Sequence, residues 1–166
     1  PKEQKILGVP VSNNEDTFFK NVCITIGDNA IRKRISESVQ AAFPTFIHDS
    51  VVRYPSVSVG QGTVVLPMAI LDAAVSVGNF CIINNNATVS HNVTLGDFVH
   101  IAINAAIAGG VEIGEGTLVG AGAIINPEIK IGKWAIIGSG AVVTKDVPDH
   151  AVVYGNPAVI KRYINK

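Results

Sequence analysis

The sequence predicts an all-β protein, a parallel β-helix of hexapeptide repeats preceded by a small partial α/β domain. Its first support is a period of six that runs without insertion from Ile47 to Val143, in which sixteen of the seventeen lead residues are aliphatic and Arg53 is the exception. Its second support is a glycine every eighteen residues, at Gly60, Gly78, Gly96, Gly114 and Gly132. Three hexapeptides therefore form one coil with three short faces.

The inward side of each coil can be read from the same pattern. The aliphatic lead residue and the small or β-branched residue four positions later, as in Thr63 and Ala87, should fill the faces and corners. Stacked coils should lie about 4.8 Å apart, the spacing of hydrogen-bonded strands. We expect the recurring glycines where the backbone turns tightly. Each coil contacts only its neighbours, so the two ends need caps.

Three segments are expected along the chain: a partial α/β domain of the nucleotide-sugar-binding type at 1–46, the β-helix at 47–148, and a cap and tail at 149–166. In the first segment, Val22–Ile26 indicates a buried strand. A helix should follow from about Ala30 to Ala42 with Asn29 as its N-cap. The basic run 32–34 is expected on the solvated face of this helix. At the C-terminal end, a turn at 154–158 should precede a basic tail.

Composition restricts the function. Thirteen basic and thirteen acidic residues give no net charge, so nothing favours nucleic acid as a partner. The chain holds no apolar run of the roughly 18 residues that span a bilayer and no leader pattern, so we expect no membrane insertion. Two cysteines are too few for a disulfide framework or a metal cage. A cytoplasmic location is expected.

The histidines carry the candidate chemistry. His91 and His100 take outward positions in their hexapeptides, whereas His48 and His150 are expected to be surface residues. Gly109 follows His91 by one coil of eighteen residues, which stacks the two side by side. An imidazole base beside an exposed backbone N–H suits acyl transfer, because the N–H stabilises the oxyanion that forms.

Two other chemistries use the same residue types. Zinc-dependent β-helices need three histidines, two of them five apart, and here the separations are 43, 9 and 50 residues, so no metal is expected. A Ser or Cys nucleophile is the other case. Ser90 should point away from His91, and Cys81 falls at an inward corner where it should only pack. The plain alternative is a set of surface histidines on an inert scaffold.

Three stretches resemble one branch of the hexapeptide-repeat acyltransferases, the sialic acid O-acetyltransferase (NeuD-like) type with its UDP-4-amino-sugar N-acetyltransferases (PglD-like). They are ITIGDNAIRKRI, VSHNVTLGDFVHIAINAAIAGGVEIG and IGSGAVVTKDVPDHAVVYGNPA. The resemblance implies left-handed coils, acetyl-CoA as co-substrate, and a homotrimer with active sites between adjacent prisms.

The resemblance also implies roles for particular residues. It makes His91 the catalytic base and brings the Gly109 N–H to the thioester carbonyl. It also implies that Asn84 contacts the acceptor sugar. The contacts with acetyl-CoA would come from His100, Ala121, Ser139 and the turn Gly155, Asn156 and Pro157. The family usually has Asp or Glu after the catalytic histidine, and this chain has Asn92. Family members also begin with a glycine-rich segment of about forty residues that is absent here. We expect that this segment precedes Pro1 in the longer protein, and a natural loss of nucleotide binding is the alternative.

The expected activity is therefore N-acetylation of a UDP-linked 4-amino-4,6-dideoxy sugar for surface glycans. O-acetylation of sialic acid or another sugar is the alternative within the enzyme class. Outside that class, the alternative is a non-catalytic β-helix that serves as a trimerisation module.

Overall fold

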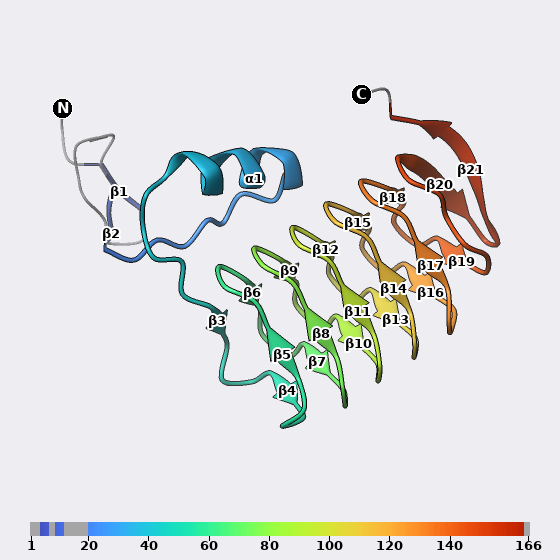
Figure 1. Ribbon diagram of the computed structural model, residues 1–166, viewed down its shortest axis with the longest axis horizontal. Coiled ribbons are helices and arrows are strands. Elements are labelled where there is room, and N and C mark those ends of the chain that lie inside the picture. The colour runs from blue at the N-terminus through green and yellow to red at the C-terminus, as the bar shows by residue number, and fades with distance from the viewer. Residues whose placement is uncertain (1–3, 7–8, 12–19, 165–166) are drawn as a thin grey trace.

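The computed structural model describes residues 4–6, 9–11 and 20–164, and confirms the predicted parallel β-helix (Figure 1). Two-residue strands stack into three faces, which we name by their first strands. The β3 face holds β3 (Phe46–Ile47), β6 (Val64–Val65), β9 (Ile82–Ile83), β12 (His100–Ile101), β15 (Leu118–Val119) and β18 (Ile136–Ile137), then β20 (Ala151–Gly155) and β21 (Ala158–Tyr163). The β4 face holds β4 (Val52–Arg53), β7 (Ile70–Leu71), β10 (Thr88–Val89), β13 (Ala106–Ile107), β16 (Ile124–Ile125) and β19 (Val142–Val143). The β5 face holds β5 (Ser58–Val59), β8 (Ser76–Val77), β11 (Thr94–Leu95), β14 (Glu112–Ile113) and β17 (Lys130–Ile131).

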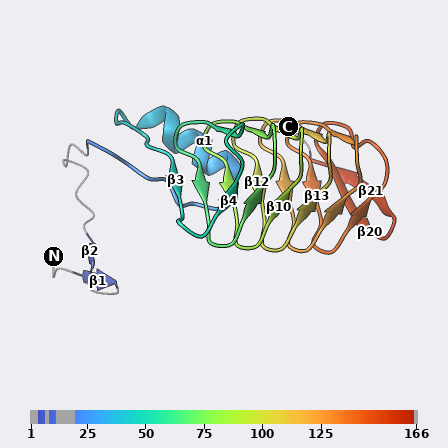
Figure 2. The same cartoon turned by 90° about the horizontal axis from the view of Figure 1, so that it is seen from below.

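From β3 to β19, every strand pairs in parallel with the strand one coil away, in a constant register of eighteen residues. His100, for example, lies between Ile82 and Leu118. The coils therefore follow one another as a straight stack, which Figure 2 shows from below. Three turns connect the faces: the β3/β4 corner (84–87, 102–105, 120–123, 138–141), the β4/β5 corner (90–93, 108–111, 126–129) and the β5/β3 corner (78–81, 96–99, 114–117, 132–135).

The inward positions are those that the period of six predicts. From Val65 to Val143 every lead residue is at most 4% exposed, and the residues four later line the same core. Arg53 is exposed because it belongs to the first coil, which is covered by a neighbouring coil on one side only. The exception to the aliphatic pattern thus falls where the core is incomplete.

The glycines at intervals of eighteen do not have the role that the sequence predicted. None of them has a positive φ. A Cβ on Gly78 would lie 2.7 Å from the carbonyl carbon of Gly96, so these positions stay glycine because successive coils approach closely at the β5/β3 corner. The left-handed conformation falls instead on the third residue of each corner, where Asn92 has φ 58° and Gly110 φ 70°.

The N-terminal helix α1 (Asn29–Ser38) differs from its prediction at both ends. Its N-cap is Asp28, whose carboxylate accepts a hydrogen bond from the Ile31 N–H at 2.8 Å, and Asn29 lies inside the first turn. The helix ends before Val39, which is extended. The reason is tertiary: Ala42 exchanges two backbone hydrogen bonds with the segment 20–22, which requires extended backbone.

The predicted strand Val22–Ile26 does not form. A strand needs a neighbouring strand, and in the described residues the nearest bridge, from Asn21 to Ala42, falls just before this segment. Ile24 is nevertheless buried, packed with Phe80 and Phe98 of the β-helix. Residues 1–3, 7–8 and 12–19 of the expected α/β segment lie outside the described part, and β1 (Gln4–Ile6) pairs antiparallel with β2 (Val9–Val11).

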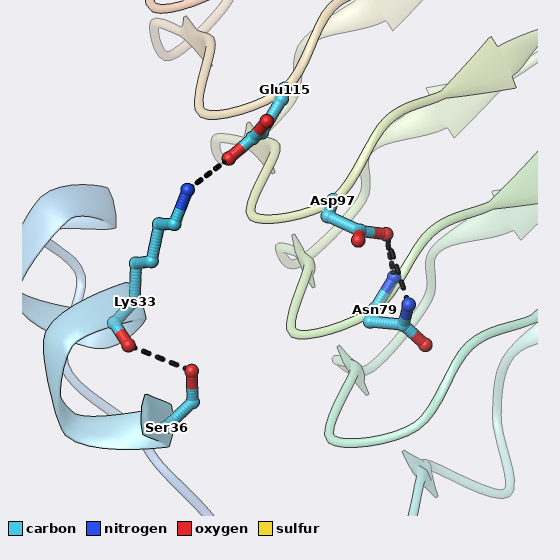
Figure 3. A network of polar contacts seen from close by, with 5 residues as sticks. All are labelled: Lys33, Ser36, Asn79, Asp97 and Glu115. Atoms are coloured by element: carbon cyan, nitrogen blue, oxygen red, sulfur yellow. Dashed lines mark hydrogen bonds and ion pairs between the residues drawn. The ribbon is translucent and has the colours of Figure 1, made fainter. Parts of the chain in front are cut away.

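The basic run of α1 was predicted to be solvated, and this is wrong for two of its three residues. Arg32 is completely buried, and Lys33 is half-buried, with its ammonium 2.6 Å from the Glu115 carboxylate (Figure 3). Arg34 is exposed, as predicted. Hydrophobic periodicity misassigned the helix because the surface beneath it also presents backbone carbonyls and an acidic side chain of the β5/β3 corner, which bind cations.

At the C-terminal end, β20 continues the β3 face in parallel with β18 and then turns back into β21 through Asn156–Pro157. Lys161 and Arg162, predicted to lie in a tail, are part of β21. This hairpin covers the last coil of the stack. Among the residues that the structure describes, no helix has the length and apolarity to cross a membrane.

Candidate active site

His91 lies at the β4/β5 corner, in the turn between β10 and β11, with its side chain exposed. Its imidazole lies directly over Gly109 of the next coil: a Cβ added to Gly109 would be 2.5 Å from Cε1 and 2.7 Å from Nε2 of the ring. The backbone holds this pair in register, because the Gly110 N–H donates to the His91 carbonyl at 3.0 Å. In the described residues the Gly109 N–H has no protein acceptor.

Asn92 contacts the other side of the ring. Its side-chain Nδ2 is 3.1 Å from His91 Nδ1. Asn92 also occupies the left-handed position of the corner, which Asn adopts far more readily than most residues. An amide at this position can present either its N–H₂ or its oxygen to Nδ1. With the oxygen there, Nδ1 carries the proton and Nε2 is free to act as a base.

His100 begins β12 on the β3 face and is half-buried. Its Nδ1 lies 3.3 Å from the Gly27 carbonyl oxygen, and its Nε2 lies 3.4 Å from the Nδ2 of Asn84. Burial lowers the pKa of His100 below its ordinary value of 6.5, and the positive charge of Arg32 adds to this, while the hydrogen bond to Gly27 opposes it. Burial therefore favours the neutral form of the ring.

The remaining residues assigned by resemblance lie on the β3/β4 corner or at the end of the stack. Ala121 and Ser139 are exposed and one coil apart, and the Gly140 N–H donates to the Ala121 carbonyl at 2.9 Å. Asn84 occupies the same corner two coils earlier. The turn Gly155–Pro157 is exposed at the C-terminal end of β20. These positions form a line that runs along one edge of the prism.

The structure does not bring the two groups of residues together within one chain. His91, Asn92 and Gly109 lie on one edge of the β4 face, and Asn84, Ala121 and Ser139 lie on the other. The outward residues of the face between them are apolar except Thr88, and three are well exposed: Val52 is 57%, Ile70 39% and Ile124 46% exposed. The β5 face has polar outward residues instead, namely Ser58, Ser76, Thr94, Glu112 and Lys130.

The other titratable candidates are separate from these groups. His48 is exposed, as expected, but His150 is half-buried and lines a cavity of about 610 Å³ together with Leu118 and Trp134. Cys81 is fully buried, donates to the Gly96 carbonyl, and has its pKa raised to about 12 by burial, so it packs and does not react. No group of three metal-binding side chains occurs in the described residues.

Sequence reasoning missed two contributions to this region, the carbonyl of Gly27 and the side chain of Arg32. Both belong to the ITIGDNAIRKRI stretch, for which the sequence predicts a strand and a solvated helix. A signal was present, since this stretch is one of the three that carry the family resemblance. Which of its residues bind the β-helix depends on how α1 lies against the corner, and local sequence does not determine that.

Comparison with known proteins independently supports the resemblance to the hexapeptide-repeat transferases. The family described as bacterial transferase hexapeptide (six repeats) matches residues 92–127 and 110–145. Among solved structures, the acetyltransferase domain of PglB from Neisseria gonorrhoeae FA1090 is 35% identical, with a TM-score of 0.83 over 85% of this chain and 70% of that one. A variant of perosamine N-acetyltransferase from Caulobacter crescentus, solved with CoA and GDP-perosamine, is 33% identical, with a TM-score of 0.92 over 96% of this chain and 80% of that one.

A third similar structure is WeeI from Acinetobacter baumannii AYE, which is 30% identical, with a TM-score of 0.87 over 95% of this chain and 81% of that one. No curated protein sequence matches significantly. The hexapeptide repeat, the β-helical structure and the sequence identity over most of each neighbour all indicate the same family. The chain belongs to the bacterial hexapeptide transferases with left-handed parallel β-helices, in their PglD-like branch of acetyl-CoA-dependent sugar acetyltransferases.

Proposed function

We propose that this protein transfers an acetyl group from acetyl-CoA to the amino group of a nucleotide-linked 4-amino-4,6-dideoxy sugar, with His91 as the general base. The contact of the His91 ring with Gly109 carries the proposal, because it places a base beside an unpaired backbone N–H. The Caulobacter crescentus neighbour, whose ligands are CoA and GDP-perosamine, supports a nucleotide sugar as acceptor. We place the activity in the cytoplasm, in the synthesis of surface glycans.

The residues of the site would act in sequence. The Gly109 N–H binds the thioester carbonyl oxygen and stabilises the negative charge that develops on it. As the acceptor nitrogen bonds to the carbonyl carbon, His91 Nε2 takes the proton that this nitrogen loses. When the carbon–sulfur bond breaks, the imidazolium returns the proton to the departing sulfur. The step needs no further co-reactant.

The fit of the co-substrate to this chain rests on Gly109. Any other residue at position 109 would place its Cβ against the His91 imidazole, so the ring can lie over this backbone only when residue 109 is glycine. The proposed pantetheine contacts at Ala121 and Ser139 lie on the opposite edge of the β4 face from His91 and Gly109. We therefore infer that a second copy of the chain supplies one of the two edges.

A homotrimer satisfies this requirement. With three β4 faces turned toward a three-fold axis, the β4/β5 corner of each copy lies next to the β3/β4 corner of the following copy. Val52, Ile70 and Ile124, which are exposed in the single chain, would then be buried. His91 and Gly109 of one copy would meet the Asn84, Ala121 and Ser139 positions of its neighbour, which gives three equivalent sites.

The test is an acetyl-transfer assay with the natural full-length protein, in which the release of free CoA thiol is followed. UDP-linked and GDP-linked 4-amino-4,6-dideoxy sugars are compared with sialic acid. We expect turnover with an amino sugar and little with sialic acid, and the reverse would establish the O-acetyltransferase alternative. If calorimetry detects no acetyl-CoA binding, the protein is a scaffold and the proposal fails.

A further inference from the structure

Arg32 is a buried cation whose partners are all uncharged. Its side chain has no exposed surface, yet each of its donor groups has an acceptor. Nε donates to the Phe80 carbonyl at 2.7 Å, and Nη2 donates to the Phe98 carbonyl at 2.9 Å and to Asn29 Oδ1 at 2.7 Å. Nη1 faces the carbonyls of Ile26, at 2.9 Å, and of Gly27, at 3.3 Å. A guanidinium has five N–H groups, so its donor capacity is fully used.

These contacts connect two parts of the protein that the chain itself leaves far apart. Phe80 and Phe98 occupy the same position in successive coils of the β5/β3 corner, while Ile26 and Gly27 form the loop that leads into α1. The guanidinium therefore holds the loop against the β-helix. Asn29, bound to Arg32, donates in turn to the Gly116 carbonyl at 2.9 Å, so the attachment extends over a third coil.

The loop ends at the His100 ring. Held by Arg32, the Gly27 carbonyl lies 3.3 Å from His100 Nδ1, and a carbonyl can only accept a hydrogen bond. On the other side of the ring, Asn84 Oδ1 already accepts from the Asn85 N–H at 2.8 Å, which turns its Nδ2 toward His100 Nε2. An amide N–H₂ can only donate. The two neighbours thus agree on one tautomer, with the proton on Nδ1 and a lone pair on Nε2.

We propose that Arg32 is a positioning residue that acts through the Gly27 carbonyl, fixing His100 in the tautomer whose Nε2 accepts a hydrogen bond from an amide N–H of acetyl-CoA. The role of this lone pair rests on the proposed function, in which acetyl-CoA is the acetyl donor. In the free protein the Asn84 amide donates to this lone pair, and an amide N–H of the bound co-substrate would replace it. His100 would then orient acetyl-CoA, a task that a protonated ring could not perform.

The surroundings of His100 agree with this assignment. Arg32 is the charged group that acts on the ring from α1, and the neighbouring strands contribute Ile82 and Leu118, which carry no charge. Protonation of Nε2 would set two donors, Nε2–H and the Asn84 amide, against each other. Burial lowers the pKa of His100 in the same direction. The geometry and the desolvation therefore both favour the neutral ring.

The test is histidine nitrogen NMR of the full-length protein, which reports the tautomer and the pKa of each ring. In the wild type, the His100 signals should show a protonated Nδ1 and an unprotonated Nε2. The variant Arg32→Lys keeps the charge but has three donors for five acceptors, so the Gly27 loop should loosen. His100 should then populate both tautomers, and its pKa should rise as water enters. Arg34→Lys, at an exposed position of the same helix, is the matched control and should leave the signals of His100 unchanged.

Asn84→Asp provides a test in a variant that leaves Arg32 intact. A carboxylate facing Nε2 accepts where the amide donated, so His100 should bind a proton on Nε2 and its pKa should rise above that of the wild type. A wild-type ring with its proton on Nε2, or an Arg32→Lys ring identical to the wild type, overturns the proposal. Absence of acetyl transfer to any amino sugar would defeat the proposed function but would leave these NMR results standing.

Discussion

The His91 imidazole occupies the space where a side chain on Gly109 would have to be, with Nε2 2.7 Å from the position of the absent Cβ. The relationship follows from the register of eighteen residues, since each corner residue lies on its counterpart in the next coil. It makes glycine at position 109 a requirement of the site and not of the fold. The backbone of Gly109 does not have a positive φ, so other residues could adopt its conformation.

Gly109→Ala should therefore remove activity and leave stability almost unchanged. The added methyl meets the movable ring of His91, which can swing into solvent, so the base and the N–H lose their alignment. We expect turnover to slow by about a hundredfold or more, on the scale of losing a general base. Gly78→Ala is the matched contrast, because its methyl would meet backbone atoms at 2.7 Å and should lower the melting temperature. Equal activity of Gly109→Ala and the wild type would contradict the proposed site.

His91→Gln should slow turnover by about 10²- to 10⁴-fold while the affinity for acetyl-CoA, measured by calorimetry, changes little. Glutamine can still occupy the corner but cannot take up a proton at neutral pH. His48→Gln, at an exposed corner of the first coil, is the control and should retain full turnover. Near-normal turnover in the His91 variant would remove this residue from the mechanism.

Asn92→Asp tests the departure from the family pattern. Asp is tolerated in the left-handed conformation of this corner, and its carboxylate accepts the Nδ1 proton of His91 without the ambiguity of an amide. The charge also favours the imidazolium, so the acid limb of the kcat/KM profile should move to higher pH. Above that limb the rate should equal or exceed that of the wild type. A profile that superimposes on the wild type would show that residue 92 does not orient the base.

The lowered pKa of His100 predicts how stability depends on pH. The unfolded chain binds this proton near pH 6.5 and the folded protein only at lower pH, so stability is lost as the pH falls below about 6.5. The loss stops once the pH is below the folded pKa as well. His100→Gln should reduce this slope, which can be measured from urea midpoints on either side of about pH 6.5. An identical slope in the variant would show that His100 does not contribute to it.

Ile124→Lys should break the proposed trimer. The side chain lies on the outward side of the β4 face, 46% exposed in the single chain, and a lysine there would be buried without a partner at the three-fold interface. Light scattering should then give the mass of a monomer, and transfer should fail because the two edges of the site separate. Thr94→Lys, at an exposed position of the β5 face, should remain trimeric. A wild-type monomer at micromolar concentration would refute the shared site.

Part of the candidate site follows from the repeat alone. Once the eighteen-residue register is known, the contact between His91 and Gly109 and the alignment of Ala121 with Ser139 can be counted from the sequence. The contact between His100 and Asn84 follows less directly, because it joins a strand to the corner of the preceding coil. Each of these contacts joins residues in the same or neighbouring coils, so it can be placed without knowing how more distant parts of the chain pack.

The sequence by itself determined the β-helix, because each coil rests on the next and a period of six repeated over about a hundred residues leaves one way to bury the aliphatic side chains. Only the tertiary structure decided the arrangement of the N-terminal segment. There the apolar pattern of the helix predicted that Arg32 would be solvated, yet Arg32 is buried, because unpaired carbonyls of Phe80 and Phe98 lie under α1 and a guanidinium satisfies them. Hydrophobic periodicity reports only where apolar side chains are buried. It contains no information about backbone hydrogen-bond acceptors that another element presents.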